Sequence, residues 1–61
     1  METKTMTYGS VRNQLLSKTR PDGIYTDPED GTEYDMNDPY DRTDAVDVAV
    51  MRLEKQGYKI V

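Results

Sequence analysis

The chain has 61 residues, and Leu, Ile, Val and Phe supply only ten of them, so any core it builds is thin. Cysteine and histidine are absent, which excludes disulfides, thiolate metal sites, cysteine nucleophiles and the commonest general base. The net charge of −4 is modest as an average, but the charges are unevenly distributed.

Acidic residues are concentrated in the middle of the chain. Residues 22–47 hold ten of the twelve acids and one cation, Arg42, which gives this segment a charge of −9. The flanking segments are positive, with +3 over residues 1–21 and +2 over residues 48–61. A solvated acidic loop is the simpler interpretation of this block, and a surface that binds a basic partner is the more specific one.

The N-terminal third predicts a loosely structured terminus followed by one short helix. Residues 1–8 alternate threonine with longer side chains, which favours a flexible tail or a frayed strand. A short helix is predicted over residues 10–18, with Ser10 as its N-cap and apolar residues spaced i, i+4. The Arg-Pro-Asp-Gly sequence at residues 20–23 is a strong turn signal that ends this helix.

A β-hairpin is predicted over residues 24–35. Pro28 presets the first turn position, and Gly31 supplies a left-handed residue that returns the chain to the ladder. With Pro28 to Gly31 as the loop, Tyr25 lies opposite Tyr34, and the two rings share one face of the hairpin.

The main helix is predicted over residues 42–56. Asp41 or Thr43 can cap its start, and Gly57 suits the position that follows its last turn. A short β-prone run at residues 58–61 then suits a strand that returns beside the hairpin.

Together these elements predict an α+β fold with one small domain over residues 9–61, preceded by the tail or frayed strand at residues 1–8. Its order is a short N-terminal helix, a β-hairpin, a main C-terminal helix and a short terminal strand, with a three-stranded, mainly antiparallel sheet. The expected core consists of Val11, Leu15, Ile24, Tyr25, Tyr34, Val46, Ala49, Val50, Leu53, Tyr58 and Ile60.

Enzymatic chemistry finds no support in this composition. The two serines have no histidine to activate them, and no Gly-x-x-x-x-Gly-Lys phosphate loop is present. A calcium loop that starts at Asp35 has Pro39 and Tyr40 where an acid and a glycine are needed. We therefore expect a non-enzymatic protein with no cofactor and no dedicated metal site.

The partner is also constrained by charge and hydropathy. Seven of the eight basic residues are split between the two ends of the chain, so direct nucleic-acid binding is not expected. No apolar run approaches the roughly 18 residues of a membrane helix. The N-terminus lacks the apolar stretch of a secretory signal, so a cytoplasmic protein without a membrane partner is the expectation.

The leading hypothesis is that an acidic face docks on a basic surface of another protein. Tyrosine is both rigid and amphipathic and is common at interfaces, so the tyrosines of the acidic block are included. The predicted partner-binding residues are Asp27, Glu29, Asp30, Glu33, Asp35, Asp38, Asp41, Asp44, Tyr25, Tyr34 and Tyr40.

Acids recur at every third position from Asp38 through Asp41 and Asp44 to Asp47. Three helical residues advance about 4.5 Å along the axis, so helical members of this set form a slanting row of negative charge. Such a row can imitate nucleic-acid phosphates in a basic cleft. The simpler interpretation is that acids at a helix start suit the helix dipole.

An alternative hypothesis uses the back of the main helix. On a helical wheel Val48 and Met51 fall outside the main apolar stripe, which suggests a second interface of a small structural or regulatory interaction module. Single exposed apolar residues are nevertheless ordinary. The expected oligomeric state is a monomer or a weak homodimer.

In size and acidity the chain resembles the small acidic inhibitors made by bacteriophages and mobile elements, some of which imitate DNA. The resemblance is one of composition and involves no motif. It implies an inhibitor that binds a host protein, and it assigns no functional residue.

Overall fold

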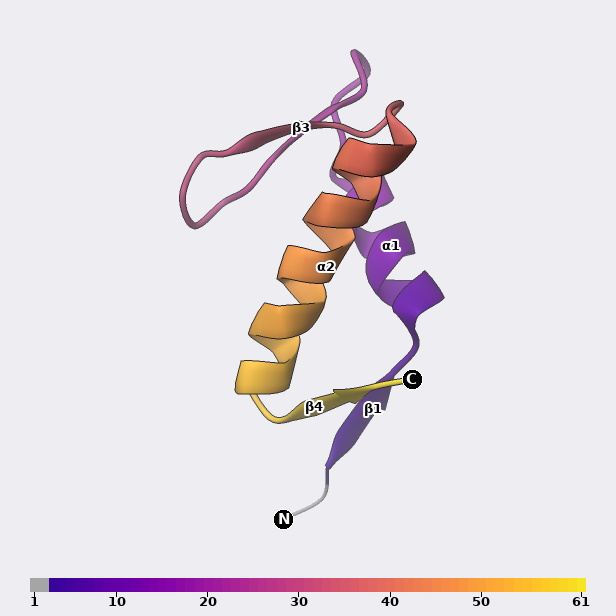
Figure 1. Ribbon diagram of the computed structural model, residues 1–61, viewed down its shortest axis with the longest axis vertical. Helices are drawn as coiled ribbons and strands as arrows, with labels where there is room; N and C mark the ends of the chain where they lie inside the picture. Colours follow the sequence, from indigo (N-terminus) through magenta and orange to yellow (C-terminus); the bar gives the residue numbers. More distant parts are fainter. Residues whose placement is uncertain (1–2) are drawn as a thin grey trace.

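A computed structural model describes residues 3–61 as an elongated molecule of 40 × 22 × 18 Å. Two helices and four short strands make up the regular structure of these residues (Figure 1). In order they are β1 (Lys4–Met6), α1 (Tyr8–Ser17), β2 (Ile24–Thr26), β3 (Glu33–Asp35), α2 (Pro39–Lys55) and β4 (Tyr58–Ile60). The predicted α+β class is confirmed.

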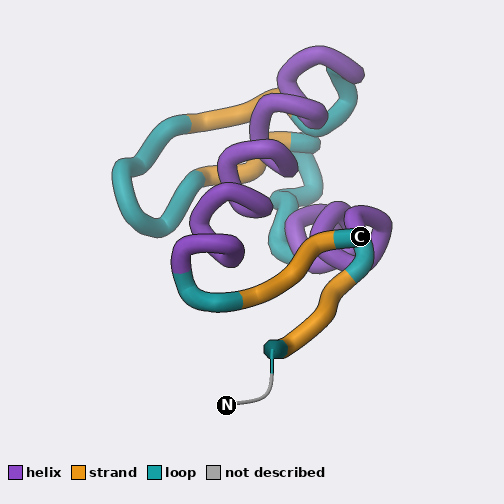
Figure 2. Tube along the Cα trace, turned by 60° about the horizontal axis from the view of Figure 1, so that its bottom comes forward, coloured by secondary structure: helices purple, strands orange, loops and turns teal. Residues whose placement is uncertain are grey.

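Helix α2 is the central element of the fold. It contacts α1, β3 and β4, and it runs along the long axis (Figure 1). The β2–β3 hairpin and α1 lie on different sides of α2, and the β1–β4 pair lies at the C-terminal end of the helix (Figure 2). Within the described residues, neither helix is both long and apolar enough to cross a membrane.

The predicted three-stranded, mainly antiparallel sheet is wrong. The strands form two separate pairs: β2 with β3, antiparallel, and β1 with β4, parallel, with Lys4 opposite Tyr58 and Met6 opposite Ile60. The physical reason is the length of α2, because 17 helical residues span about 25 Å. The chain therefore leaves the hairpin behind, and β4 meets β1 instead.

Of the two alternatives for residues 1–8, the structure has a strand at Lys4–Met6, and Tyr8 already belongs to α1. Residues 1 and 2 of that segment lie outside the described residues. Two backbone hydrogen bonds extend the terminal pairing, from Val61 N to Met6 O at 2.9 Å and from Tyr8 N to Val61 O at 3.0 Å. The N-terminal segment is thus tied to the C-terminal strand.

The hairpin has the predicted register. Tyr25 lies opposite Tyr34, and their ring centroids are 6.5 Å apart. Asp27 N donates to Thr32 O at 2.8 Å, which closes the loop, and Gly31 has the left-handed φ of 75° that the turn requires. Local turn chemistry therefore determines this element.

Both helices begin earlier than predicted, because other residues cap them. Thr7, not Ser10, caps α1, and its hydroxyl accepts a hydrogen bond from Ser10 N at 3.1 Å. Asp38 caps α2 with a bond from Tyr40 N at 2.9 Å. Pro39 occupies the first turn of α2, where its missing N–H costs nothing.

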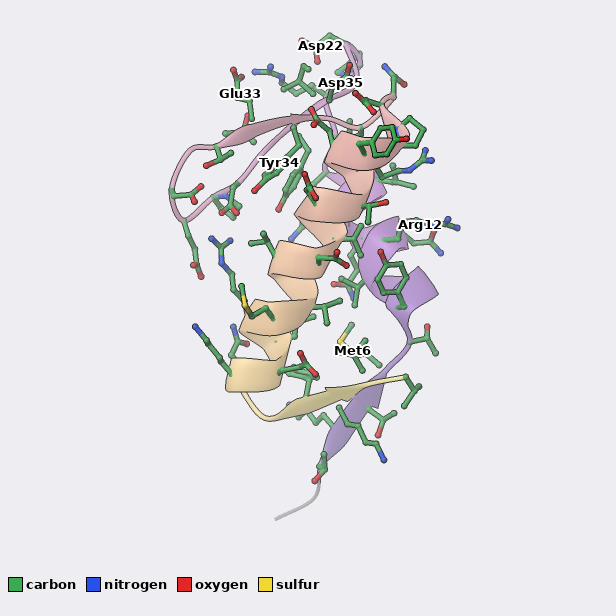
Figure 3. The ribbon with its side chains drawn as sticks, in the orientation of Figure 1. Met6, Arg12, Asp22, Glu33, Tyr34 and Asp35 are labelled. Carbon is green, nitrogen blue, oxygen red and sulfur yellow. The ribbon has the colours of Figure 1, made fainter. Side chains whose placement is uncertain are left out.

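The core lies where α1, the hairpin and α2 meet. The buried apolar residues are Val11, Leu15, Tyr25, Met36, Ala45 and Val46, with Met6, Tyr34, Ala49, Val50, Leu53 and Ile60 packed against them. Figure 3 shows Tyr34 pointing from β3 toward α2, while Met6 lies between β1 and the helices. Met36 and Ala45 were not in the expected core, whereas the expected Ile24 and Tyr58 are only half-buried and lie outside this cluster.

Candidate functional site

The acids of the hairpin loop converge on one arginine of α2. Arg52 Nη1 donates to Asp27 Oδ2 at 2.5 Å, and its Nε lies 3.0 Å from Glu29 Oε2. Asp30 Oδ2 lies 3.7 Å from Nη2. Asp27 is 3% exposed, and its other oxygen accepts a hydrogen bond from Glu29 N. We call Arg52 and these three acids the arginine clamp.

The clamp has clear electrostatic consequences. The hydrogen bond to Asp27 raises the pKa of Arg52, and the neighbouring carboxylates add to this effect. Hydrogen bonds from Thr32 lower the pKa of Asp30, with a further contribution from Arg52. Three carboxylates thus hold one guanidinium and fasten the hairpin loop to the C-terminal half of α2.

A second arginine engages two more acids at the other end of the hairpin. Arg20 Nη2 lies 3.2 Å from Glu33 Oε2, and its Nε lies 3.4 Å from Asp22 Oδ1. All three side chains are at least half exposed, so these pairs contribute little to stability. Together the two arginines account for half of the acids in residues 22–47.

The remaining acids of that segment form no ion pair within residues 3–61. They are Asp35, Asp38, Asp41, Asp44 and Asp47, which we call the acidic ridge. The ridge starts at the end of β3 and continues over the first three turns of α2. Figure 3 shows the side chain of Asp35 at the end of the molecule where α2 begins.

Part of the ridge has a local structural role. Asp35 accepts a hydrogen bond from Asn37 N at 3.0 Å, and Asp41 accepts one from Asp35 N at 3.2 Å. Asp47 receives a long contact of 3.5 Å from the Tyr8 hydroxyl. Asp44 has no side-chain hydrogen bond to a described residue, so it is the ridge carboxylate with the least structural explanation.

The three predicted interface tyrosines occupy very different environments. Tyr25 is 7% exposed and Tyr34 is half-buried, and desolvation raises the pKa of both phenols. Tyr40 is 83% exposed and stands on the first turn of α2 within the acidic ridge. The structure therefore brings one of these tyrosines to the acidic surface and places the other two in or against the core.

The two residues of the alternative interface also differ. Met51 is 51% exposed, whereas Val48 is half-buried. The surface available for an apolar contact on this side of α2 is centred on Met51.

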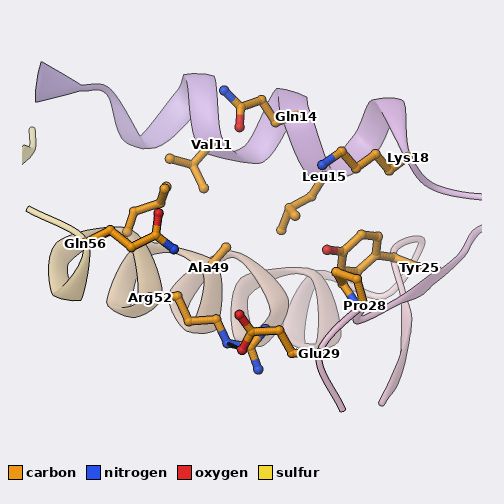
Figure 4. Close-up of a pocket in the computed structure, with 11 residues that line it drawn as sticks. Val11, Gln14, Leu15, Lys18, Tyr25, Pro28, Glu29, Ala49, Arg52 and Gln56 are labelled. Atoms are coloured by element: carbon orange, nitrogen blue, oxygen red, sulfur yellow. Dashed lines mark ion pairs between the residues drawn. The ribbon is translucent and has the colours of Figure 1, made fainter. Parts of the chain in front are cut away.

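A groove of about 210 Å³ lies between α1 and α2, and the hairpin loop closes one end (Figure 4). Apolar side chains from both helices line it, and polar groups stand around its margin. Its lining residues are Val11, Gln14, Leu15, Lys18, Tyr25, Pro28, Glu29, Ala49, Arg52, Leu53 and Gln56. Among the described residues, no group of three or more acids is arranged to hold a metal ion.

Neither the clamp nor the groove was predicted from the sequence. Arg52 lies 25 residues after Asp27, so no local spacing connects them. One signal was available in the sequence: Arg52 and Leu53 are neighbours in the predicted main helix, and the apolar face of that helix must pack against the hairpin. Arg52 could therefore have been expected near the acids of the hairpin loop. Comparisons with protein-family models, with curated proteins and with solved structures gave no match.

Proposed function

We propose that this is a non-enzymatic binding protein of the small acidic inhibitor type, which docks the acidic ridge on a basic surface of another protein. The supporting observation is the division of the acids. Five are held by Arg20 and Arg52, while the five of the ridge follow one another along the chain and make no ion pair within residues 3–61. Tyr40, 83% exposed, adds an amphipathic contact at the same place.

The geometry of the ridge suits a basic cleft that normally holds nucleic acid. Asp41, Asp44 and Asp47 follow one another at about 4.5 Å along the axis of α2. Arg42 points about 100° away from Asp41 around the helix, so it does not interrupt this row. A partner with phosphate-binding lysines and arginines would meet a line of carboxylates in place of phosphates.

The test is capture of partners from a lysate of the native host at low and high salt, with the full chain as bait. We expect a basic protein that is retained at low salt and lost as salt rises, because surface charge attraction is screened. Double-stranded DNA should displace this basic protein from the bait. The double variant Asp44→Asn/Asp47→Asn should reduce capture about tenfold or more.

The matched control is Asp22→Asn/Glu33→Gln, which removes the same number of charges from residues that already pair with Arg20. It should leave capture nearly unchanged. Retention that is indifferent to salt, or equal losses in the two double variants, would show that net charge or another surface governs binding.

A second candidate function rests on Met51, whose side chain is 51% exposed on α2. In this alternative the protein is a structural or regulatory module that self-associates or binds a partner through the apolar back of the helix. We expect Met51→Lys to abolish that association and the ridge variants to leave it intact. Analytical ultracentrifugation decides the dimer form, which fails if the native chain and Met51→Lys both sediment as monomers.

A further inference from the structure

The groove between α1 and α2 contains the hydroxyl of a largely buried tyrosine that makes no hydrogen bond within the fold. Tyr25 is 7% exposed, and its hydroxyl makes no hydrogen bond to any residue in the range 3–61. Every fully buried side-chain polar atom in that range has a hydrogen-bond partner. Because the Tyr25 hydroxyl has none, it must reach the open space of the groove. Figure 4 shows it facing the space between the two helices.

The floor and size of the groove define the body of a ligand. Val11 and Leu15 from α1 and Ala49 and Leu53 from α2 form an apolar floor. The volume of about 210 Å³ is smaller than the roughly 300–1,000 Å³ of sites for larger ligands. It exceeds the roughly 150 Å³ of an apolar cavity that holds benzene, so one ring with a short polar substituent fits.

The margin of the groove defines the polar end of the ligand. Lys18 stands on the α1 side and makes no ion pair within the described chain. Glu29, which belongs to the hairpin loop, is already engaged by Arg52 of α2 at 3.0 Å. Lys18 and Tyr25 lie at the same end of the groove, nearest the hairpin (Figure 4). An ammonium group and a hydroxyl that donates are complementary to a carboxylate.

We propose that this groove binds a small monocarboxylate with a single ring or a similarly compact apolar body. Lys18 and the Tyr25 hydroxyl hold the carboxylate, and the apolar body rests on Leu15 and Leu53. Desolvation raises the pKa of Tyr25, which keeps the hydroxyl protonated and able to donate. The site shares no residue with the acidic ridge, so the outcome of its test is independent of the proposed docking function.

The experiment is a titration of the full chain with phenylacetate, followed by amide NMR, with phenylacetamide as the neutral analogue. We expect saturable shifts at Leu15, Lys18, Tyr25 and Leu53, with a dissociation constant on the order of 1 mM for so small a ligand. Phenylacetamide should bind about tenfold more weakly, because it lacks the charge that Lys18 recognises.

Variants separate this site from general association with the surface. Lys18→Gln should weaken phenylacetate binding about tenfold, and Tyr25→Phe several-fold, while the amide spectrum retains the dispersion of a folded chain. The matched control is Lys55→Gln, which removes an exposed lysine outside the groove and should change nothing. Absence of saturable shifts, equal affinity for acid and amide, or insensitivity to Lys18→Gln would each overturn the proposal.

Discussion

Replacing Met36 with alanine should lower the free energy of unfolding by about 3 kcal/mol, a value within the range for buried methionine. Met36 is 3% exposed and packs in the small core cluster. A chain of 61 residues has a total stability of only about 3–9 kcal/mol, so a third or more would be lost. Urea unfolding followed by circular dichroism measures the effect as a fall in the midpoint concentration.

Met51→Ala is the matched control, since it deletes the same atoms from a side chain that is 51% exposed. Its effect should stay below about 0.5 kcal/mol, as for other surface substitutions. Equal effects of the two substitutions would mean that Met36 is not part of the core in solution.

Met36 also illustrates what the sequence could not predict. It lies between β3 and α2, in a segment with no periodic pattern that separates the predicted hairpin at residues 24–35 from the predicted helix at residues 42–56. Its burial follows from a tertiary contact, because Met36 N donates to Gly23 O at 2.8 Å and holds this loop against the preceding turn. Gly23 has a φ of 88°, a left-handed backbone conformation that residues with a Cβ rarely adopt, so this turn favours glycine.

Elements with local determinants were predictable. Pro28 and Gly31 lie at opposite ends of one short loop, and the cross-strand pairing of Tyr25 with Tyr34 follows from that loop length. The pairing of β4 with β1 has no such local cause. Each strand has three residues, too few for a pattern to select a partner, and the length of α2 decides which strand β4 can reach.

The candidate site was predictable in outline only. The acidic segment was visible as a block of charge, but its division into paired and unpaired acids depends on where Arg20 and Arg52 lie in space. Asp27 shows this most clearly, since it was expected on a docking surface and instead lies buried beside Arg52. The distribution of charge along the sequence identifies a negative segment, but it does not show which carboxylates remain unpaired and available to a partner.

Replacing Arg52 with glutamine should lower the midpoint of thermal unfolding by about 10 °C, because it leaves the buried carboxylate of Asp27 without its cation. It also releases Glu29 and Asp30, so the hairpin loop loses its attachment to α2. The matched control is Arg20→Gln, which breaks two exposed ion pairs. Exposed pairs are worth little, so that variant should lose less than about 3 °C.

The pH dependence of the stability difference between the native chain and Arg52→Gln shows whether the charge of Arg52 or its packing is responsible for that difference. The pKa of Asp30 is lowered from 3.8, chiefly by hydrogen bonds from Thr32 and further by Arg52. The contribution of Asp30 to folding stability is therefore present above pH 3.8 and is lost as the pH falls through the folded-state pKa. Arg52→Gln removes the part of this contribution that comes from Arg52, so the difference in stability between the native chain and the variant narrows in acid. A gap that stays constant from neutral pH to about pH 3 would instead assign the role of Arg52 to the packing of its aliphatic stem.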